Sequence, residues 1–363
     1  MDANIEKTPE NAYLCPMQKR LVSILTPMYN TGKYVHRLLD SVLSQDYPCI
    51  EMVVMDDGST DGSLAVVEGY AARFADRGYT LRYESQPHSG QSVAIKNGLP
   101  LISGEYLAWP DSDDYYASSD AISKMVGVLA SADEAFQMVR TQVSYVDDGT
   151  FRLLQVEGLR AHEEEDRSLF EDCLLGRNGF YYCAGSYLVR TEVLKDLTGF
   201  DIYTENSVGQ NWQLLLPILY HYRCKTILEP LYTVVLRAGS HSRGPAGGYD
   251  WKLARHEADF RTRLETLKRT KGFPQPLWEH YRKQMMSRDN RCLLDLAIKE
   301  NRRDAALERL PYCRADMGKL AYRTMSLLLQ TKGGPRILNA CKALHHRLYL
   351  YKRRVQSFLR HDR

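Results

Sequence analysis

Apolar residues in the first third of the chain form short runs that alternate with segments of helical spacing. The runs, which predict buried strands, lie at 21–26, 52–55, 79–84 and 105–109. Between them, apolar positions recur every three or four residues over 35–47, 63–76 and 91–101. This spacing is typical of amphipathic helices. Strands that alternate with helices predict βαβ units and a mostly parallel sheet flanked by helices, an α/β fold.

The pattern is less regular after residue 126. Strands are predicted at 136–146, 183–190 and 226–236, and a helix kinked at Pro217 over 207–222. Beyond a Gly- and Pro-rich stretch at 244–248 the chain is charged and helical, without clear strands, so we place a domain boundary there. The predicted organisation is a polar leader at 1–20, an α/β domain at 21–245 and a helical region at 249–363.

Composition narrows the class of protein. The 363 residues suffice for about two domains, and 44% hydrophobic with 26% charged residues is a globular balance. No apolar run reaches the roughly 20 residues that span a bilayer, and the N-terminus lacks the pattern of a secretory signal. The eight cysteines are scattered and form no C-x-x-C pair. We therefore expect a cytoplasmic protein with reduced cysteines.

The C-terminal tail carries a charge pattern of its own. From Thr331 to Arg363 there are nine Lys or Arg residues and one acid, Asp362, although the whole chain has a net charge of only +3. Apolar residues at helical spacing over 336–360 predict a basic amphipathic helix. Such a helix can lie on an anionic membrane, here the inner face of the plasma membrane; packing on the body or on a second subunit is the other interpretation. No nucleic-acid motif accompanies the basic face, so we expect no nucleic-acid partner.

Acidic and polar clusters follow three of the predicted strands, at 27–30, 56–61 and 111–114. Ligands of such sheets bind at the carboxyl ends of the strands. The carboxylates of Asp111 and Asp113 are hard ligands suited to Mg²⁺ or Mn²⁺, which typically bridges protein carboxylates and a diphosphate. Alternatively, Asp113 or Asp114 caps a helix that begins near Ser119, and the pattern alone leaves both interpretations open.

Three segments in order, VSILTPMYNTGKYVHRLLDSVLSQDY, VVMDDGSTDGS and SGEYLAWPDSDD, closely resemble the N-terminal domain of family 2 glycosyltransferases, which have the GT-A fold. The resemblance is close over 20–125, looser over 180–245 and absent beyond 250. It implies a nucleotide-sugar-binding half at 21–125 and an acceptor-binding half at 126–245. The implied activity is transfer of a sugar from a UDP-sugar, with inversion, to a saccharide or lipid-linked acceptor, in bacterial surface polysaccharide or lipopolysaccharide synthesis.

The resemblance also implies roles for residues of the nucleotide half. Pro27 and Tyr29 would lie against the base, and Asp57 would bind the uracil, since an aromatic ring can stack on a base and a carboxylate can accept the imide N–H. Asp111 and Asp113 would face the ribose and a diphosphate bound to Mn²⁺ or Mg²⁺. Tyr29 could instead be a half-buried loop aromatic, and Asp57 a turn-forming residue.

Three further residues are candidates for the nucleotide or metal site. Asp114 lies next to the metal carboxylates and is a candidate third ligand. Lys96 stands where the family often has arginine and could contact the nucleotide, or simply lie on a solvated helix face. His241, in a loop that resembles the family's basic loop over the diphosphate, could bind metal or phosphate, or belong to an ordinary exposed loop.

The residues expected to hold the catalytic base depart from the family pattern. Where the family has Gly-Glu-Asp, this chain has Gly209-Gln210-Asn211. An inverting transferase needs a general base to deprotonate the acceptor hydroxyl, and an amide cannot serve. Glu205 is the nearest carboxylate that could substitute, and Asp201 is another.

This departure keeps a second function open, a nucleotide-sugar-binding protein without transferase activity. A sugar-phosphate nucleotidyltransferase is less consistent with the sequence, because those enzymes usually have a Gly-rich, Arg-containing loop after the first strand, and residues 27–32 read PMYNTG. A dinucleotide-dependent oxidoreductase is disfavoured because no G-x-G-x-x-G follows that strand.

Overall fold

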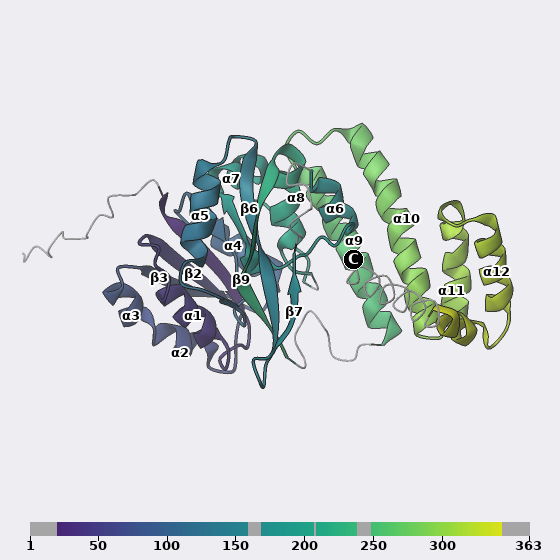
Figure 1. Ribbon diagram of the computed structural model, residues 1–363, viewed down its shortest axis with the longest axis horizontal. Coiled ribbons are helices and arrows are strands. Elements are labelled where there is room, and N and C mark those ends of the chain that lie inside the picture. The colour runs from purple at the N-terminus through teal and green to yellow at the C-terminus, as the bar shows by residue number, and fades with distance from the viewer. Residues whose placement is uncertain (1–19, 159–167, 207, 238–247, 343–363) are drawn as a thin grey trace, which may run out of the picture. The chain divides into compact units, whose positions relative to one another are not determined.

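The computed structural model describes residues 20–158, 168–206, 208–237 and 248–342 (Figure 1). The chain divides into two compact units, one of residues 1–243 with 262–273 and one of residues 244–261 with 274–363. The predicted leader, except its last residue, lies outside the described residues. So do most of the predicted boundary, at 244–247, and the tail after Lys342.

A nine-stranded sheet, in the order β3-β2-β1-β4-β8-β6-β9-β5 with β7 beside β6, forms the centre of the first unit. The strands are β1 (Val22–Met28), β2 (Ile50–Asp56), β3 (Thr80–Ser85), β4 (Tyr106–Ala108), β5 (Tyr115–Tyr116), β6 (Phe136–Asp147), β7 (Leu153–Glu157), β8 (Tyr187–Arg190) and β9 (Arg223–Leu236). Strands β3, β2, β1 and β4 run parallel, as do β6 and β9, whereas β5, β7 and β8 pair antiparallel.

Helices follow most of these strands. They are α1 (Val35–Leu43), α2 (Ser63–Glu68), α3 (Ala71–Asp76), α4 (Gln91–Gly98), α5 (Ala121–Ser131), α6 (Phe170–Leu175), α7 (Thr191–Thr198) and α8 (Asn211–His221). The predicted helix over 63–76 is interrupted, because α2 ends before Gly69 and α3 begins after Tyr70. Pro217 lies inside α8 as expected, but α8 begins four residues later than predicted.

The two apolar runs that open the chain become the interior strands of the sheet. Every residue of β1 and of β2 is buried, as expected for parallel strands covered on both faces. Met28 pairs with Asp56 in the register of β1 with β2, and Asp56 pairs with Ser85 in the register of β2 with β3. The three strands therefore end at one level, and the residues that follow them share one edge of the sheet.

The second unit is helical, as predicted for this part of the chain. It contains the start of α9 (Tyr249–Arg269), then α10 (Gln275–Lys299), α11 (Arg303–Arg309), a 3-10 helix (Leu310–Asp316) and α12 (Lys319–Gln330). Tyr249 packs in its core with apolar residues of the other helices, among them Leu294, Ile298 and Leu329.

The structure also bears on the expectations about membrane-spanning segments and about the cysteines. No helix among the described residues is long and apolar enough to cross a bilayer. Six of the cysteines that the structure describes are free thiols, but Cys49 is disulfide-bonded, so the expectation of reduced cysteines is wrong at this position. The spacing of isolated cysteines in a sequence gives no signal for a pair that the fold brings together.

Candidate functional site

Hydrogen bonds join the loops that follow β1, β2 and β4. The backbone N–H of Asp57 donates to the carbonyl of Met28 at 2.8 Å. The hydroxyl oxygens of Thr31 and Ser112 lie 3.0 Å apart, and the N–H of Thr60 donates to Asn30 Oδ1 at 2.8 Å. The three polar clusters singled out in the sequence thus lie beside one another at the carboxyl edge of the sheet.

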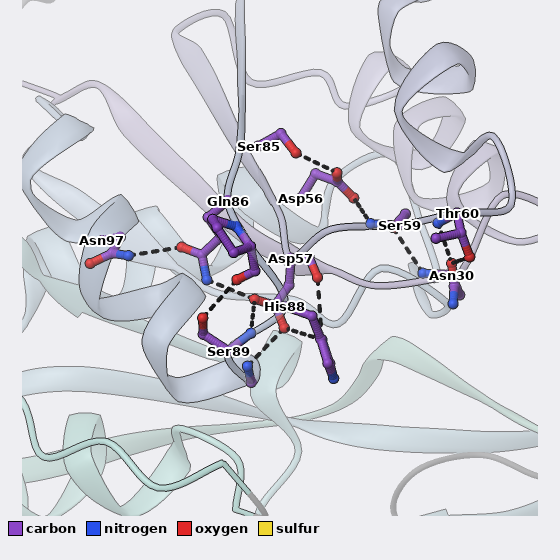
Figure 2. A network of polar contacts seen from close by, with 12 residues as sticks. Asn30, Asp56, Asp57, Ser59, Thr60, Ser85, Gln86, His88, Ser89 and Asn97 are labelled. Carbon is purple, nitrogen blue, oxygen red and sulfur yellow. Dashed lines mark hydrogen bonds and ion pairs between the residues drawn. The ribbon is translucent and has the colours of Figure 1, made fainter.

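Asp57 is the centre of a polar network at this edge (Figure 2). Its side chain is 3% exposed. Its Oδ1 accepts from Gln86 Nε2 at 2.7 Å and from the N–H of Ser89 at 2.9 Å. Its Oδ2 accepts from the N–H of Gly90 at 2.8 Å and lies 2.8 Å from His88 Nδ1. The carboxylate therefore fixes the loop 86–90, which connects β3 to α4.

The ring of Tyr29 lies against the same loop. It stacks on the imidazole of His88 with centroids 4.0 Å apart and an interplanar angle of 18°, and Tyr29 is 44% exposed. Pro27, two residues earlier, is buried within β1 and pairs with Met55. Tyr29 therefore presents a flat aromatic surface close to Asp57.

Two of the three carboxylates at 111–114 are held by neutral groups. Asp111 is half-buried and accepts from Gln91 Nε2 at 2.6 Å. Burial and the nearby charge of Asp113 raise the pKa of Asp111 to about 7. Asp114 is buried and accepts from the N–H of Val235 in β9 at 2.9 Å, and burial with the charges of Asp113 and Asp111 raises its pKa well above the ordinary value. Burial and mutual repulsion thus favour the protonated form of both carboxyl groups.

Asp113 is paired with a cation. Its Oδ2 accepts from Arg237 Nε at 3.0 Å and Nη2 at 2.7 Å, and the guanidinium also lies over the ring of Tyr34. The interpretation that Asp113 or Asp114 caps a helix is wrong, because that helix, α5, begins after Asp120.

The chemistry of this cluster suits a divalent cation. Three carboxylates that repel one another are relieved by positive charge, and Mg²⁺ is usually held by one or two carboxylates together with substrate phosphates and waters. Throughout the described ranges, no group of three His, Cys, Asp or Glu residues is arranged to hold a metal without a substrate. His241, predicted as a ligand, lies outside those ranges.

Amides occupy the neighbouring part of the site. Gln210 is fully buried beside Asp111 and partly offsets the rise in the pKa of that carboxyl group. Among the described residues, neither atom of its amide has a partner at ordinary hydrogen-bond geometry. Asn211 accepts from Trp109 Nε1 at 3.1 Å and donates to the carbonyl of Tyr182 at 3.0 Å. Asn211 therefore supports the structure, and Gln210 is the amide with unused hydrogen-bonding capacity.

The two carboxylates predicted as bases differ in their surroundings. Asp201 is exposed and pairs with Lys96 Nζ at 2.5 Å, and this bond lowers the pKa of Asp201. Glu205 is half-buried, accepts from the hydroxyl of Tyr203 at 2.8 Å, and its backbone N–H donates to Ser92 Oγ on α4 at 3.0 Å. The structure thus brings Lys96 and Asp201 to each other, and Glu205 to the start of α4.

Comparison with known proteins gives the family. Residues 23–198 match the family model for glycosyl transferase family 2. These residues are a family 2 glycosyltransferase domain. The resemblance seen in the sequence is thereby confirmed for this part of the chain.

Curated relatives carry the same class of name. The glycosyltransferase GlyA of Streptococcus pneumoniae is 36% identical over 94 residues, which is 26% of this chain and 13% of the relative. The putative teichuronic acid biosynthesis glycosyltransferase TuaG of Bacillus subtilis is 33% identical over 132 residues, 36% of this chain and 50% of the relative. The chain thus spans half or less of the length of these relatives.

Solved structures confirm the GT-A fold. Residues 1–349 of S. aureus TarS in complex with UDP-GlcNAc superpose with a TM-score of 0.56 at 18% identity, covering 86% of this chain and 88% of that one. The same protein in complex with UDP gives a TM-score of 0.54. At this identity the likeness concerns the fold alone.

The sequence analysis missed two residues of this edge, His88 and Gln91. Both lie at the carboxyl end of β3, the next parallel strand. The rule that ligands bind at such ends could have found them, but their loop contains no acid and forms no familiar pattern on its own.

Proposed function

We propose that the chain transfers a sugar from a UDP-sugar, with inversion, to a saccharide or lipid-linked acceptor in the synthesis of a bacterial surface polysaccharide or lipopolysaccharide. The observation that carries the proposal is one sheet edge with an exposed aromatic ring, Tyr29, a buried acceptor, Asp57, and the acidic cluster at 111–114. The UDP-GlcNAc complex of TarS and the teichuronic acid role in the name of TuaG support this choice of donor and product.

In this proposal the nucleotide extends along the sheet edge, with its base at Tyr29 and its diphosphate at Asp113. The uracil stacks on Tyr29, beside Pro27, and its imide N–H donates to Asp57. Asp111 faces the ribose. Lys96 is paired with the exposed carboxylate of Asp201, so we give it a secondary place in the site.

The proposed metal is Mn²⁺ or Mg²⁺, held by Asp113 together with the oxygens of the diphosphate. When bound, it would stabilise the negative charge that develops on the departing UDP. Arg237, which now neutralises Asp113, would turn its guanidinium to the diphosphate, a bidentate pairing for which arginine is suited. Asp114 holds β9 through Val235, and its role as a ligand is the less favoured one. His241 stays a prediction.

Glu205 is our proposed general base. It would take the proton of the acceptor hydroxyl, whose oxygen attacks the anomeric carbon on the face opposite to the leaving UDP and so inverts the configuration. Asp201 is the weaker candidate because it is exposed and its charge is stabilised by Lys96, which lowers its basicity.

Calorimetric titration with UDP, with and without Mn²⁺, tests the donor site, and GDP, CDP and ADP serve as controls. We expect binding that depends on Mn²⁺ and prefers UDP. Asp113→Ala should remove the dependence on Mn²⁺, whereas Asp76→Asn, a change of an exposed acid at the end of α3, should not. Mn²⁺-dependent binding of UDP by Asp113→Ala at the affinity of the native protein would refute the assignment of Asp113.

A binding protein without transferase activity is the second candidate. The amides Gln210 and Asn211 in place of the family's acids favour it, because neither can accept a proton at neutral pH. The two functions separate in one experiment, in which the protein is incubated with radiolabelled UDP-sugar and Mn²⁺. Release of UDP with transfer of the sugar to an acceptor or to water supports a transferase; tight binding without any release supports the alternative.

We further propose that the second unit contacts an anionic membrane, on the inner face of the plasma membrane. Two leucines of α12, Leu320 and Leu327, are 80% and 67% exposed, and Arg323 lies between them on the exposed side. Most of the basic tail predicted to do the same, the part after Lys342, lies outside the described residues. Sedimentation with vesicles of phosphatidylglycerol, compared with phosphatidylcholine, tests this. Leu320→Ser with Leu327→Ser should weaken binding to the anionic vesicles, and equal recovery with both lipids would contradict the proposal.

A further inference from the structure

The side chain of His88 contacts both residues that we assign to the nucleobase, Tyr29 and Asp57. Its imidazole stacks on Tyr29 at 4.0 Å, and its Nδ1 lies 2.8 Å from Asp57 Oδ2 and 3.2 Å from the Asp57 carbonyl oxygen. Figure 2 shows the ring beside Asp57. A bound uracil would likewise place a flat ring against Tyr29 and a ring nitrogen at the carboxylate of Asp57.

The acceptor capacity of Asp57 leaves no free place for a base. An ionised carboxylate accepts about four hydrogen bonds, two for each oxygen. Gln86 and the N–H of Ser89 take those of Oδ1, and the N–H of Gly90 takes one of Oδ2. The fourth is covered by His88, whose Nδ1 lies 2.8 Å from Oδ2. A nucleobase N–H can therefore reach Asp57 only at the position of the imidazole.

The three other donors are held in place. The side chain of Gln86 also accepts from Asn97 Nδ2 at 2.8 Å. Two are backbone groups of a loop that is closely packed, since a Cβ on Gly58 would lie 3.0 Å from the backbone N of His88, and one on Gly90, at φ +100°, would lie 3.0 Å from Asn206 Cα. His88, by contrast, has a side chain that is 56% exposed. Rotation about its own side-chain bonds would move the ring into solvent and leave the loop in place.

We propose that His88 fills the nucleobase position of the unliganded protein and that the base displaces it, so that this side chain lowers nucleotide affinity and limits the site to bases with a ring N–H. The inference rests on the proposed function, because it takes Tyr29 and Asp57 as the base site. Uracil and guanine have such an N–H, whereas adenine and cytosine do not, so the vacated bond to Asp57 favours UDP and GDP over ADP and CDP.

The test is calorimetric binding of UDP to the full chain with His88→Ala, compared with His36→Ala. His36 is an exposed histidine on α1 with no part in the site. Loss of the competing stack should tighten UDP binding about two- to tenfold in His88→Ala and leave His36→Ala at the native affinity. Asp57 keeps three donors in His88→Ala, so the loop should hold its structure.

A second measurement follows the displaced ring directly. NMR signals of the His88 imidazole should carry the ring-current shift of Tyr29 in the free protein and lose it when UDP saturates the site, as they do in Tyr29→Ala without UDP. Unchanged or weaker UDP binding by His88→Ala, or an imidazole signal that keeps its shift with UDP bound, would overturn the inference while leaving the donor site intact. Absence of UDP binding by both the native protein and His88→Ala would refute the proposed function itself.

Discussion

Substitution of Asp57 by asparagine separates two interpretations of this residue. As a turn-forming residue, Asp57 should be replaceable by asparagine, which favours turns equally. As the anchor of the loop 86–90, it should not be, because the amide offers one acceptor oxygen where the carboxylate offers two. The two oxygens of Asp57 accept three hydrogen bonds in the structure, and His88 Nδ1 lies 2.8 Å from Oδ2.

The magnitude follows from which donors lose their acceptor. If the amide oxygen of the substituted side chain keeps Gln86 and Ser89, the N–H of Gly90 and His88 face an NH₂ group. His88 can turn to solvent, but the N–H of Gly90 lies in a buried bond, and loss of a hydrogen bond to a charged group costs about 1.5–3 kcal/mol. We expect Asp57→Asn to destabilise this region by about 2 kcal/mol.

Native-state hydrogen exchange is the appropriate assay, because the chain has two units and a global transition would mix them. The amide of Gly90 should exchange about 30-fold faster in Asp57→Asn, the factor that corresponds to about 2 kcal/mol. The same variant should bind UDP weakly or not at all. Exchange of Gly90 at the native rate, with native UDP affinity, would refute the anchoring role and favour the turn-forming one.

Three further substitutions test other parts of the structure. Gly185→Ala should destabilise the protein by about 3 kcal/mol, because a Cβ there would lie 2.1 Å from the ring of buried Tyr232; Gly127→Ala in α5, where a Cβ meets nothing within 4 Å, should leave the melting temperature unchanged or raise it. Glu205→Gln should lower kcat for sugar transfer about 100-fold with UDP affinity unchanged, and full turnover would exclude Glu205 as the base. Asp201→Asn, in an exposed pair, should keep kcat within about threefold and change stability by less than about 1 kcal/mol in thermal unfolding.

The sequence predicted the elements whose pattern is long or fully apolar. Strands β1 and β2 and helix α1 were predicted within a few residues of their bounds. A strand buried on both faces is a continuous apolar run, and a helix buried on one face has apolar residues at regular spacing. Strand β5 has only two residues and β7 is largely exposed, so neither has a pattern to recognise. The split of α2 from α3 at Gly69 depends on tertiary packing, which periodicity does not record.

The sequence predicted which residues lie at the strand ends, but not which side chains contact one another there. The strand-end rule located Tyr29, Asp57 and the carboxylates at 111–114 on one edge. That Arg237 neutralises Asp113, that Lys96 pairs with Asp201 and that His88 covers Tyr29 depend on residues between 59 and 124 positions apart. No local pattern encodes such contacts.

The bridge made by Asn211 restricts how this site can change by mutation. An aspartate at 211 would still accept from the indole of Trp109, but its other oxygen would face the carbonyl of Tyr182 without a proton between them. A glutamate at 210 would place another charge in full burial beside Asp111. Each acid would therefore introduce repulsion that the amides avoid, so the amide pair is the form that this packing tolerates.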